Sequence, residues 1–115
     1  MTAPPAILNL RVAEARSLNP LIRLFRLRAD DGRTLPGYTA GAHLRVMVDL
    51  PGGTSDWRHY SLINLAPEAA ATDAPTEYVI AVRVEPEGRG GSRYMHQRVQ
   101  AGDRLMVEAP KNDFP

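Results

Sequence analysis

The sequence predicts an all-β fold, a six-stranded antiparallel Greek-key β-barrel with one short capping α-helix. Short segments rich in β-branched and aromatic residues recur along the chain, and turns containing glycine or proline separate them. A single segment has the spacing of a helix. The 115 residues suit one domain with one core. We favour a barrel because closure removes the edge strands that an open sheet would expose.

The first three strands are expected at residues 7–15, 21–28 and 43–50. Leu8, Leu10 and Val12 recur at every second position, which places them on one face of the first strand. Hydrophobic residues alternate in the same way along the third strand. An Ala-Asp-Asp-Gly turn at residues 29–32 follows the second strand, and a Pro-Gly-Gly turn at residues 51–53 follows the third. These signals are typical of an antiparallel sheet.

The second half of the chain is expected to contain strands at residues 56–64, 77–85 and 104–109, and a helix at residues 92–99. The segment at residues 65–75 is rich in alanine and proline, so we expect a loop there. Met95 and Val99 are four residues apart and share one face of the helix. Gly102 suits the left-handed position after a helix and is expected to end it.

The composition excludes several kinds of functional site. The chain has no cysteine, which rules out disulfides, zinc–thiolate sites and iron–sulfur ligation by its own residues. A net charge of +1 and an aromatic content of 6% argue against nucleic-acid binding. His43, His59 and His96 lack the spacing of metal ligands, so no metal site is expected. Since no signal peptide or membrane-spanning run is recognisable, we expect a cytoplasmic protein with no membrane partner.

The end of the chain differs from the usual end of a domain. It closes with Asn112-Asp113-Phe114-Pro115, and no polar tail follows the aromatic residue. Natural domain ends are generally polar and frayed. We therefore expect this chain to be one domain of a longer protein.

A glycine-rich loop, Gly88-Arg89-Gly90-Gly91-Ser92, comes directly before the expected helix. Successive glycines leave backbone N–H groups unobstructed, and such groups can form a nest for an anion. A helix capped by Ser92 would add the positive end of its dipole, and Arg89 and Arg93 would add charge. The loop therefore indicates a phosphate cradle. Taken alone it also fits a plain flexible connection, because neither the Walker A motif nor the dinucleotide glycine motif is present.

A second segment, Trp-Arg-His-Tyr-Ser-Leu at residues 57–62, combines charge, aromatic ring and hydroxyl. In an extended strand Arg58 and Tyr60 share one face, while His59 and Ser61 share the other. Arg58 can bind a phosphate through two N–H groups, and Tyr60 can lie on a planar ring. These residues suit a ligand with a flat ring and a phosphate tail. The alternative is an amphipathic strand with an exposed Arg–Tyr pair.

Together the two segments resemble the flavin-binding domains of ferredoxin reductase-type proteins. The run Arg-x-Tyr-Ser-Leu at residues 58–62 matches their Arg-x-Tyr-Ser flavin motif. Further segments are similar to the phthalate dioxygenase reductase subfamily, which includes vanillate demethylase reductases. These segments are Gly41-Ala42-His43, Ile80-Ala81-Val82, residues 85–92, Met95-His96 and Pro110-x-Asn112-x-Phe114-Pro115. They cover nearly the whole chain in the family's order.

The resemblance implies a role for each residue of the two segments. Arg58 would bind the flavin phosphate, Tyr60 would pack on the isoalloxazine, and Ser61 would take the catalytic position near the flavin's reactive nitrogen. The glycines and the serine of the loop would hold the phosphate, and the backbone of residues 81–83 would lie beside the polar edge of the ring. His59 occupies the variable position of the motif. The expected cofactor-binding residues are Arg58, His59, Tyr60, Ser61, Ala81, Val82, Arg83, Gly90, Gly91 and Ser92.

The resemblance also implies an activity. The subfamily uses FMN, and the sequence contains no additional aromatic or basic motif for the adenylate of FAD, so FMN is expected rather than FAD. In the parent enzyme NADH would reduce the flavin, which would pass electrons to a 2Fe–2S centre and then to a Rieske-type oxygenase. The family's NAD-binding and 2Fe–2S domains are absent from this chain. Residues 1–115 are therefore expected to form the FMN-binding barrel of such a reductase. The alternative is a stand-alone flavin- or nucleotide-binding module without turnover.

Overall fold

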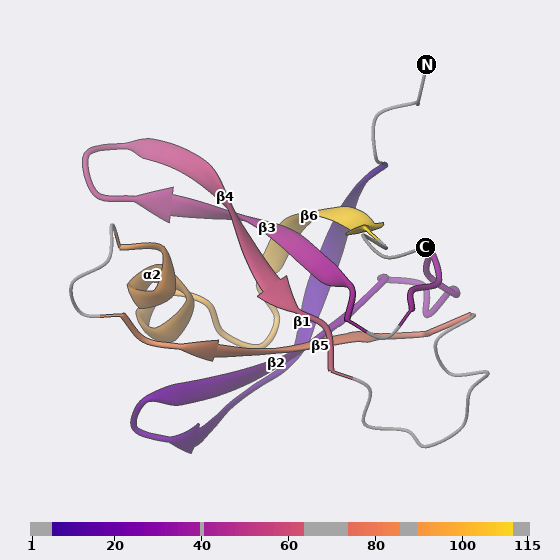
Figure 1. The fold of residues 1–115 in the computed structure, drawn as a ribbon, viewed down its shortest axis with the longest axis horizontal. Helices are drawn as coiled ribbons and strands as arrows, with labels where there is room; N and C mark the ends of the chain where they lie inside the picture. The colour runs from indigo at the N-terminus through magenta and orange to yellow at the C-terminus, as the bar shows by residue number, and fades with distance from the viewer. Residues whose placement is uncertain (1–5, 40, 64–73, 86–89, 112–115) are drawn as a thin grey trace.

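The fold is described from a computed structural model, which covers residues 6–39, 41–63, 74–85 and 90–111 (Figure 1). The expectations for the loop at residues 65–73, for residues 86–89 and for the chain end at 112–115 lie outside the described residues. The strands are β1 (Ile7–Asn19), β2 (Ile22–Arg28), β3 (His43–Leu50), β4 (Thr54–Ser61), β5 (Tyr78–Arg83) and β6 (Arg104–Lys111), and the helix is α2 (Gly91–Gln97).

The strands form one antiparallel sheet in the order β4-β3-β6-β1-β2-β5. β6 lies between β3 and β1, and β5 returns to the side of β2, as in a Greek key. The two edge strands meet at a bridge between Leu62 and Ile80, where the Ile63 N–H donates to the Val79 carbonyl at 2.9 Å. The predicted fold class is confirmed, as a half-barrel whose edges are joined at that isolated bridge in the described part of the chain.

The inner face of the sheet carries the core. The alternating residues expected on the third strand, Leu44, Val46 and Val48, are fully buried, and so is Val12 of β1. Met95 of α2 is also fully buried, so the helix covers one end of the half-barrel. Figure 1 shows α2 above the ends of β2 and β5 and beside the β3–β4 hairpin. The short helix is therefore a cap, as the sequence predicts.

Strand β1 is longer than expected because it serves two neighbours. Its first residues, Ile7–Arg11, pair with β6, and residues 11–19 pair with β2. Register shifts occur between Val12 and Glu14 and again between Ser17 and Asn19. Bulges of this kind bend a strand and increase its twist, which lets one strand follow a curved sheet.

The helix has different ends from those expected. It begins at Gly91, with Gly90 as the N-cap, and it ends at Gln97. Gly102 does adopt a left-handed conformation with φ 96°, but it lies in the turn before β6 and not at the end of α2. The helix end is instead held by Arg23 of β2, a contact that residue spacing does not reveal.

Candidate functional site

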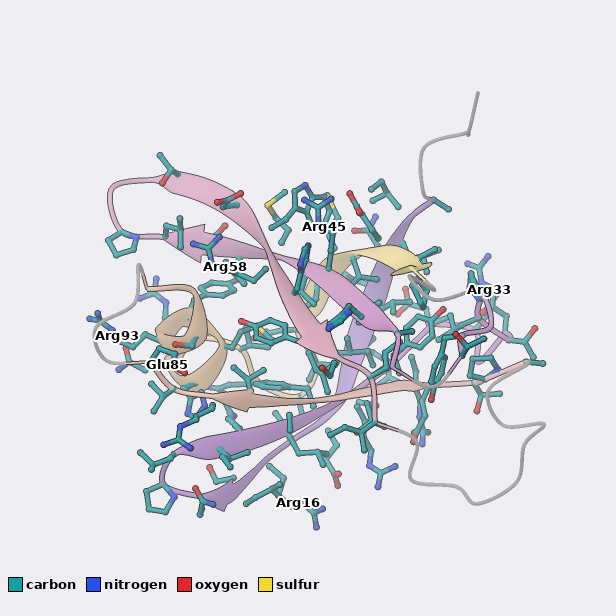
Figure 2. All side chains as sticks on the ribbon, viewed as in Figure 1. Arg16, Arg33, Arg45, Arg58, Glu85 and Arg93 are labelled. Carbon is teal, nitrogen blue, oxygen red and sulfur yellow. The ribbon has the colours of Figure 1, made fainter. Side chains whose placement is uncertain are left out.

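A cavity of about 330 Å³ lies where β4, the end of β5 and the start of α2 come together. Figure 2 shows Arg58 and Glu85 at this end of the fold, and Arg33 at the opposite end. Glu85 is the lining residue that was not predicted to bind the cofactor. The lining residues are Arg58, His59, Tyr60, Arg83, Glu85, Gly91 and Ser92. The structure thus gathers most of the predicted site from three separate elements.

Arg58 is held on one side by its own strand. Its Nη1 donates to Asp56 Oδ2 at 2.9 Å and to the Trp57 carbonyl at 2.9 Å. The Asp56 carboxylate is fixed in turn, because its Oδ1 accepts the Trp57 N–H at 2.8 Å. No hydrogen bond to a described residue engages the Nε or Nη2 of Arg58. That edge of the guanidinium has the geometry for a two-point contact with a phosphate.

The backbone of Gly91 lies against Arg58. A Cβ atom built on Gly91 would lie 3.0 Å from Arg58 Nε, 3.1 Å from Arg58 Cγ and 3.3 Å from Val48 Cγ2. A side chain at this position would therefore have to push the guanidinium aside by a few tenths of an ångström. The cradle and the cation predicted from two distant segments lie side by side, and together they fit an anionic group.

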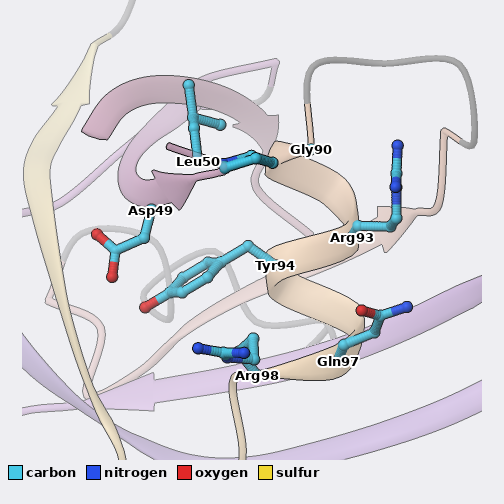
Figure 3. Close-up of a pocket in the computed structure, with 8 residues that line it drawn as sticks. Asp49, Leu50, Gly90, Arg93, Tyr94, Gln97 and Arg98 are labelled. Atoms are coloured by element: carbon cyan, nitrogen blue, oxygen red, sulfur yellow. The ribbon is translucent and has the colours of Figure 1, made fainter. Parts of the chain in front are cut away.

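Gly90 must be glycine both for its backbone conformation and for the space around it. Its φ is 104°, a left-handed conformation, and a Cβ atom there would lie 2.7 Å from Pro51 Cδ in the β3–β4 turn. Gly90 does not line the cavity with Arg58. It borders a neighbouring pocket of about 230 Å³ between that turn and the outer side of α2, in which Tyr94 extends between Asp49 and Arg98 (Figure 3).

Ser92 lines the cavity but does not cap the helix as expected. Gly90 is the N-cap, and the start of α2 has no side-chain cap. The hydroxyl of Ser92 instead accepts the backbone N–H of Glu85 at 2.7 Å. This bond ties the end of β5 to α2 across the glycine loop, and it leaves the hydroxyl proton able to donate to a ligand.

Tyr60 presents its ring to the same cavity. The side chain is half-buried and packs against the core. Burial raises the pKa of its hydroxyl, and the charge of Arg58 opposes the rise. The phenol is therefore neutral at pH 7, so its ring is an uncharged surface on which a planar ligand can stack.

The remaining residues of the motif lie differently. His59 is exposed, and its ring centroid lies 6.3 Å from that of His43 on the outer face of the sheet, although it also borders the cavity. Ser61 is exposed and pairs with His43 at the end of β4. It does not line the cavity. Ser61 is thus not brought together with Arg58 and Tyr60.

Strand β5 faces the region of the cavity with backbone groups more than with side chains. The Val79 carbonyl points to Ile63 and so away from β2. Since hydrogen bonding alternates along an antiparallel strand, the N–H and carbonyl groups of Ala81 and Arg83 point the same way. The Val82 side chain is buried in the core. Of these predicted residues, Arg83 lines the cavity, whereas Ala81 and Val82 do not.

Sequence reasoning missed some residues that shape the site. Glu85 belongs to the segment 85–92 that resembles the reductase subfamily, and this position could have identified it as a residue of the site. Asp56 stands two residues before Arg58 on the same strand face, and that spacing allows their ion pair at 2.9 Å. Across the described ranges, no group of three His, Cys, Asp or Glu side chains could hold a metal ion. The helix that the structure describes is too short and too polar to cross a membrane.

A family model for the oxidoreductase FAD-binding domain matches residues 9–115. The heme-dependent oxidative N-demethylase beta subunit of Ectopseudomonas mendocina (strain ymp) is 43% identical over 109 residues, which are 95% of this chain and 32% of that protein. The phthalate 4,5-dioxygenase oxygenase reductase subunit of Pseudomonas putida is 46% identical over 90 residues, which are 78% of this chain and 25% of that protein.

Among solved structures, phthalate dioxygenase reductase is described as a modular structure for electron transfer from pyridine nucleotides to 2Fe–2S. It aligns with a TM-score of 0.78 and 34% identity, over 96% of this chain and 31% of that one. The chain therefore spans a quarter to a third of the length of these relatives. The family model extends over nearly all of the chain, and it includes every residue around the cavity. The chain belongs to the FAD-binding domains of ferredoxin reductase-type oxidoreductases.

Proposed function

We propose that this chain binds FMN in the cavity between β4, β5 and α2. The observation that carries the proposal is the contact of the Gly91 backbone with the Arg58 side chain, where a Cβ would lie 3.0 Å from Nε. Arg58 and the backbone of Gly91 would hold the phosphate, with the hydroxyl of Ser92 as a further donor. Tyr60 would pack against the flavin ring.

The polar edge of the ring would meet the chain at two places. The backbone groups of Ala81 and Arg83 point away from β2, in the direction of β4, and would hydrogen-bond the ring. Ser61, at the end of β4, would lie near the reactive nitrogen at the rim of the cavity. His59 would contribute through its backbone, because its side chain faces outward beside His43. In this proposal the flavin supplies the redox chemistry, and the chain binds and orients it.

FMN is proposed rather than FAD, although the family description names FAD. The cavity of about 330 Å³ is at the small end for a ligand site, and it ends at Gly91 and Ser92. The neighbouring pocket of about 230 Å³ shares no lining residue with it, so the cavity with Arg58 does not continue into that pocket through a common residue. Competition between FMN and FAD for the purified chain tests this choice, and FMN is expected to bind at least about tenfold more tightly.

The parent protein is proposed to be an NADH-dependent reductase that supplies electrons to a Rieske-type oxygenase. The named relatives support this, since they include a dioxygenase reductase subunit and a reductase described as passing electrons from pyridine nucleotides to 2Fe–2S. Those relatives are three to four times as long as the region matched here. Nicotinamide-binding and 2Fe–2S domains would therefore complete the electron path, and this chain alone would hold a flavin without full turnover.

The test is cofactor uptake by the purified chain. We expect a yellow protein that binds one FMN and releases it on denaturation. Dithionite should reduce the bound flavin, whereas NADH should reduce it very slowly, since the described residues include no second domain to bind the nicotinamide. A colourless protein that takes up no FMN from a large excess would overturn the proposal. Rapid reduction by NADH would overturn the part that assigns hydride entry to another domain.

A further inference from the structure

Helix α2 is too short to determine its own position. It has seven residues, fewer than the 12–15 or so that an isolated helix needs for marginal stability in water. No side chain caps its N-terminus. Yet Gly91, at that end, lies so close to Arg58 that an added Cβ would be 3.0 Å from its Nε. The helix must therefore be held by contacts with the sheet.

Arg23 of β2 makes the most extensive of these contacts. Its Nη1 donates to the carbonyls of Met95 at 3.2 Å, His96 at 2.9 Å and Val99 at 2.6 Å. These carbonyls belong to the last turn of the helix and the residues after it, where helices have no internal donors. The guanidinium also lies over the Phe25 ring, with its Cζ 5.3 Å from the ring centroid. Arg23 thus joins the sheet to the C-terminal end of α2.

Two further hydrogen bonds hold the helix, one near each of its ends. His96 Nε2 lies 2.6 Å from the Val82 carbonyl of β5, and Ser92 Oγ accepts the Glu85 N–H at 2.7 Å. Both act on the side of α2 that faces β5. Arg23 acts from β2, so without it these two hydrogen bonds would hold α2 from the β5 side alone.

We infer that Arg23 is a positioning residue for the phosphate end of the cofactor site. The inference rests on the proposed function, because it concerns how Gly91 meets the phosphate ligand. Gly91 and Gln97 are six residues apart, about 9 Å along the helix axis. A rotation of α2 by about 10° about its C-terminal end, where the His96 contact would remain, would move Gly91 by roughly 1.5 Å, which is larger than the tolerance of about 0.5 Å for a built binding site. The flavin ring, which Tyr60 would hold, depends less on this rotation.

The experiment measures affinity for FMN and for riboflavin, which has no phosphate, in Arg23→Ala and in a matched control. The control is Arg16→Ala, since Arg16 is an exposed arginine of the neighbouring strand β1 and points away from the sheet in Figure 2. We expect Arg23→Ala to weaken FMN binding about tenfold and riboflavin binding less than twofold. Arg16→Ala should change neither. Amide hydrogen exchange at Tyr94, whose N–H donates to the Gly90 carbonyl at 2.9 Å, should be faster in Arg23→Ala than in Arg16→Ala.

A second variant keeps the inference falsifiable if Arg23→Ala does not fold. Arg23→Lys keeps the charge but loses the planar guanidinium that lies over Phe25 while its Nη1 reaches the three carbonyls, and it should weaken FMN binding about threefold. Unchanged FMN affinity in both folded variants, or equal losses for FMN and riboflavin, would overturn the positioning role. Failure of the unsubstituted chain to bind FMN would instead refute the proposed function.

Discussion

The chain contains two pairs of adjacent glycines that look alike in sequence and differ in the structure. Gly52 and Gly53 form the β3–β4 turn with φ values of 90° and 84°, and a Cβ added to either would meet nothing within 4 Å. Gly90 and Gly91 begin α2, and a Cβ added to either would press on a neighbour. The first pair reverses the chain, and the second allows a close approach between segments.

The two pairs differ in why glycine is needed at each position. In the turn, glycine is needed for its left-handed backbone, and the space around it is open. At α2, Gly90 needs both the backbone and the space, whereas Gly91 has no positive φ and needs the space alone. Gly91 is therefore the residue whose glycine character is explained by the site.

The largest effect is expected from Gly90→Ala. Both Gly90→Ala and Gly52→Ala place a side chain in a left-handed conformation, which costs about 1–2 kcal/mol. Gly90→Ala also drives a Cβ to 2.7 Å from Pro51 Cδ, and relieving such a contact costs about 1–3 kcal/mol more. Urea denaturation should show Gly90→Ala to be less stable than Gly52→Ala by at least about 1 kcal/mol. Equal losses would mean that Pro51 moves aside without cost.

Gly91→Ala should affect binding and leave stability nearly unchanged. Alanine favours a helix over glycine by about 1 kcal/mol, which offsets the crowding against Arg58 and Val48. The added Cβ would displace the guanidinium and cover the backbone, so FMN affinity should fall about tenfold, or about 1.4 kcal/mol. Fluorescence titration with FMN measures the change. Gly53→Ala is the matched control, and FMN affinity equal in the two variants would contradict the close-approach account.

Ser92→Ala should have the smallest effect of the three. It removes the acceptor of the Glu85 N–H and a donor to the phosphate, so we expect FMN to bind about fivefold more weakly, or about 1 kcal/mol. The control is Ser55→Ala beside the other glycine pair, where the exposed hydroxyl donates to Asp49 at 3.0 Å. Isothermal titration with FMN compares the two variants. A loss in Ser55→Ala as large as that in Ser92→Ala would remove the distinction between the regions.

Local patterns were enough to predict the strand faces. The period-two alternation of Leu44, Val46 and Val48 identified the buried side of β3, since only one register buries all three. The same reasoning placed Arg58 and Tyr60 on one face of β4, and both line the cavity. The two-sided pairing of β1 was not predicted, because bulges near Val12 and Ser17 have no signature in residue spacing.

Contacts between distant residues limited the prediction of the helix and the site. Arg23 ends α2 from more than seventy positions earlier in the sequence, so Gly102 was the wrong stop signal. Ser92 was predicted to be the N-cap, but the segment after β5 supplies it with the Glu85 N–H as an alternative partner. Which glycine pair is crowded also depends on the β3–β4 turn reaching α2, and this could not be deduced from either segment alone.

The central claim is that Arg58 and Gly91 together form a phosphate site. Its most direct test is the affinity of Arg58→Ala for FMN and for riboflavin, with Arg33→Ala at the opposite end of the fold as control. A lost charge-assisted hydrogen bond corresponds to about 2 kcal/mol, so FMN should bind about thirtyfold more weakly and riboflavin less than twofold. Equal weakening of both ligands, or no weakening of FMN, would contradict the assignment.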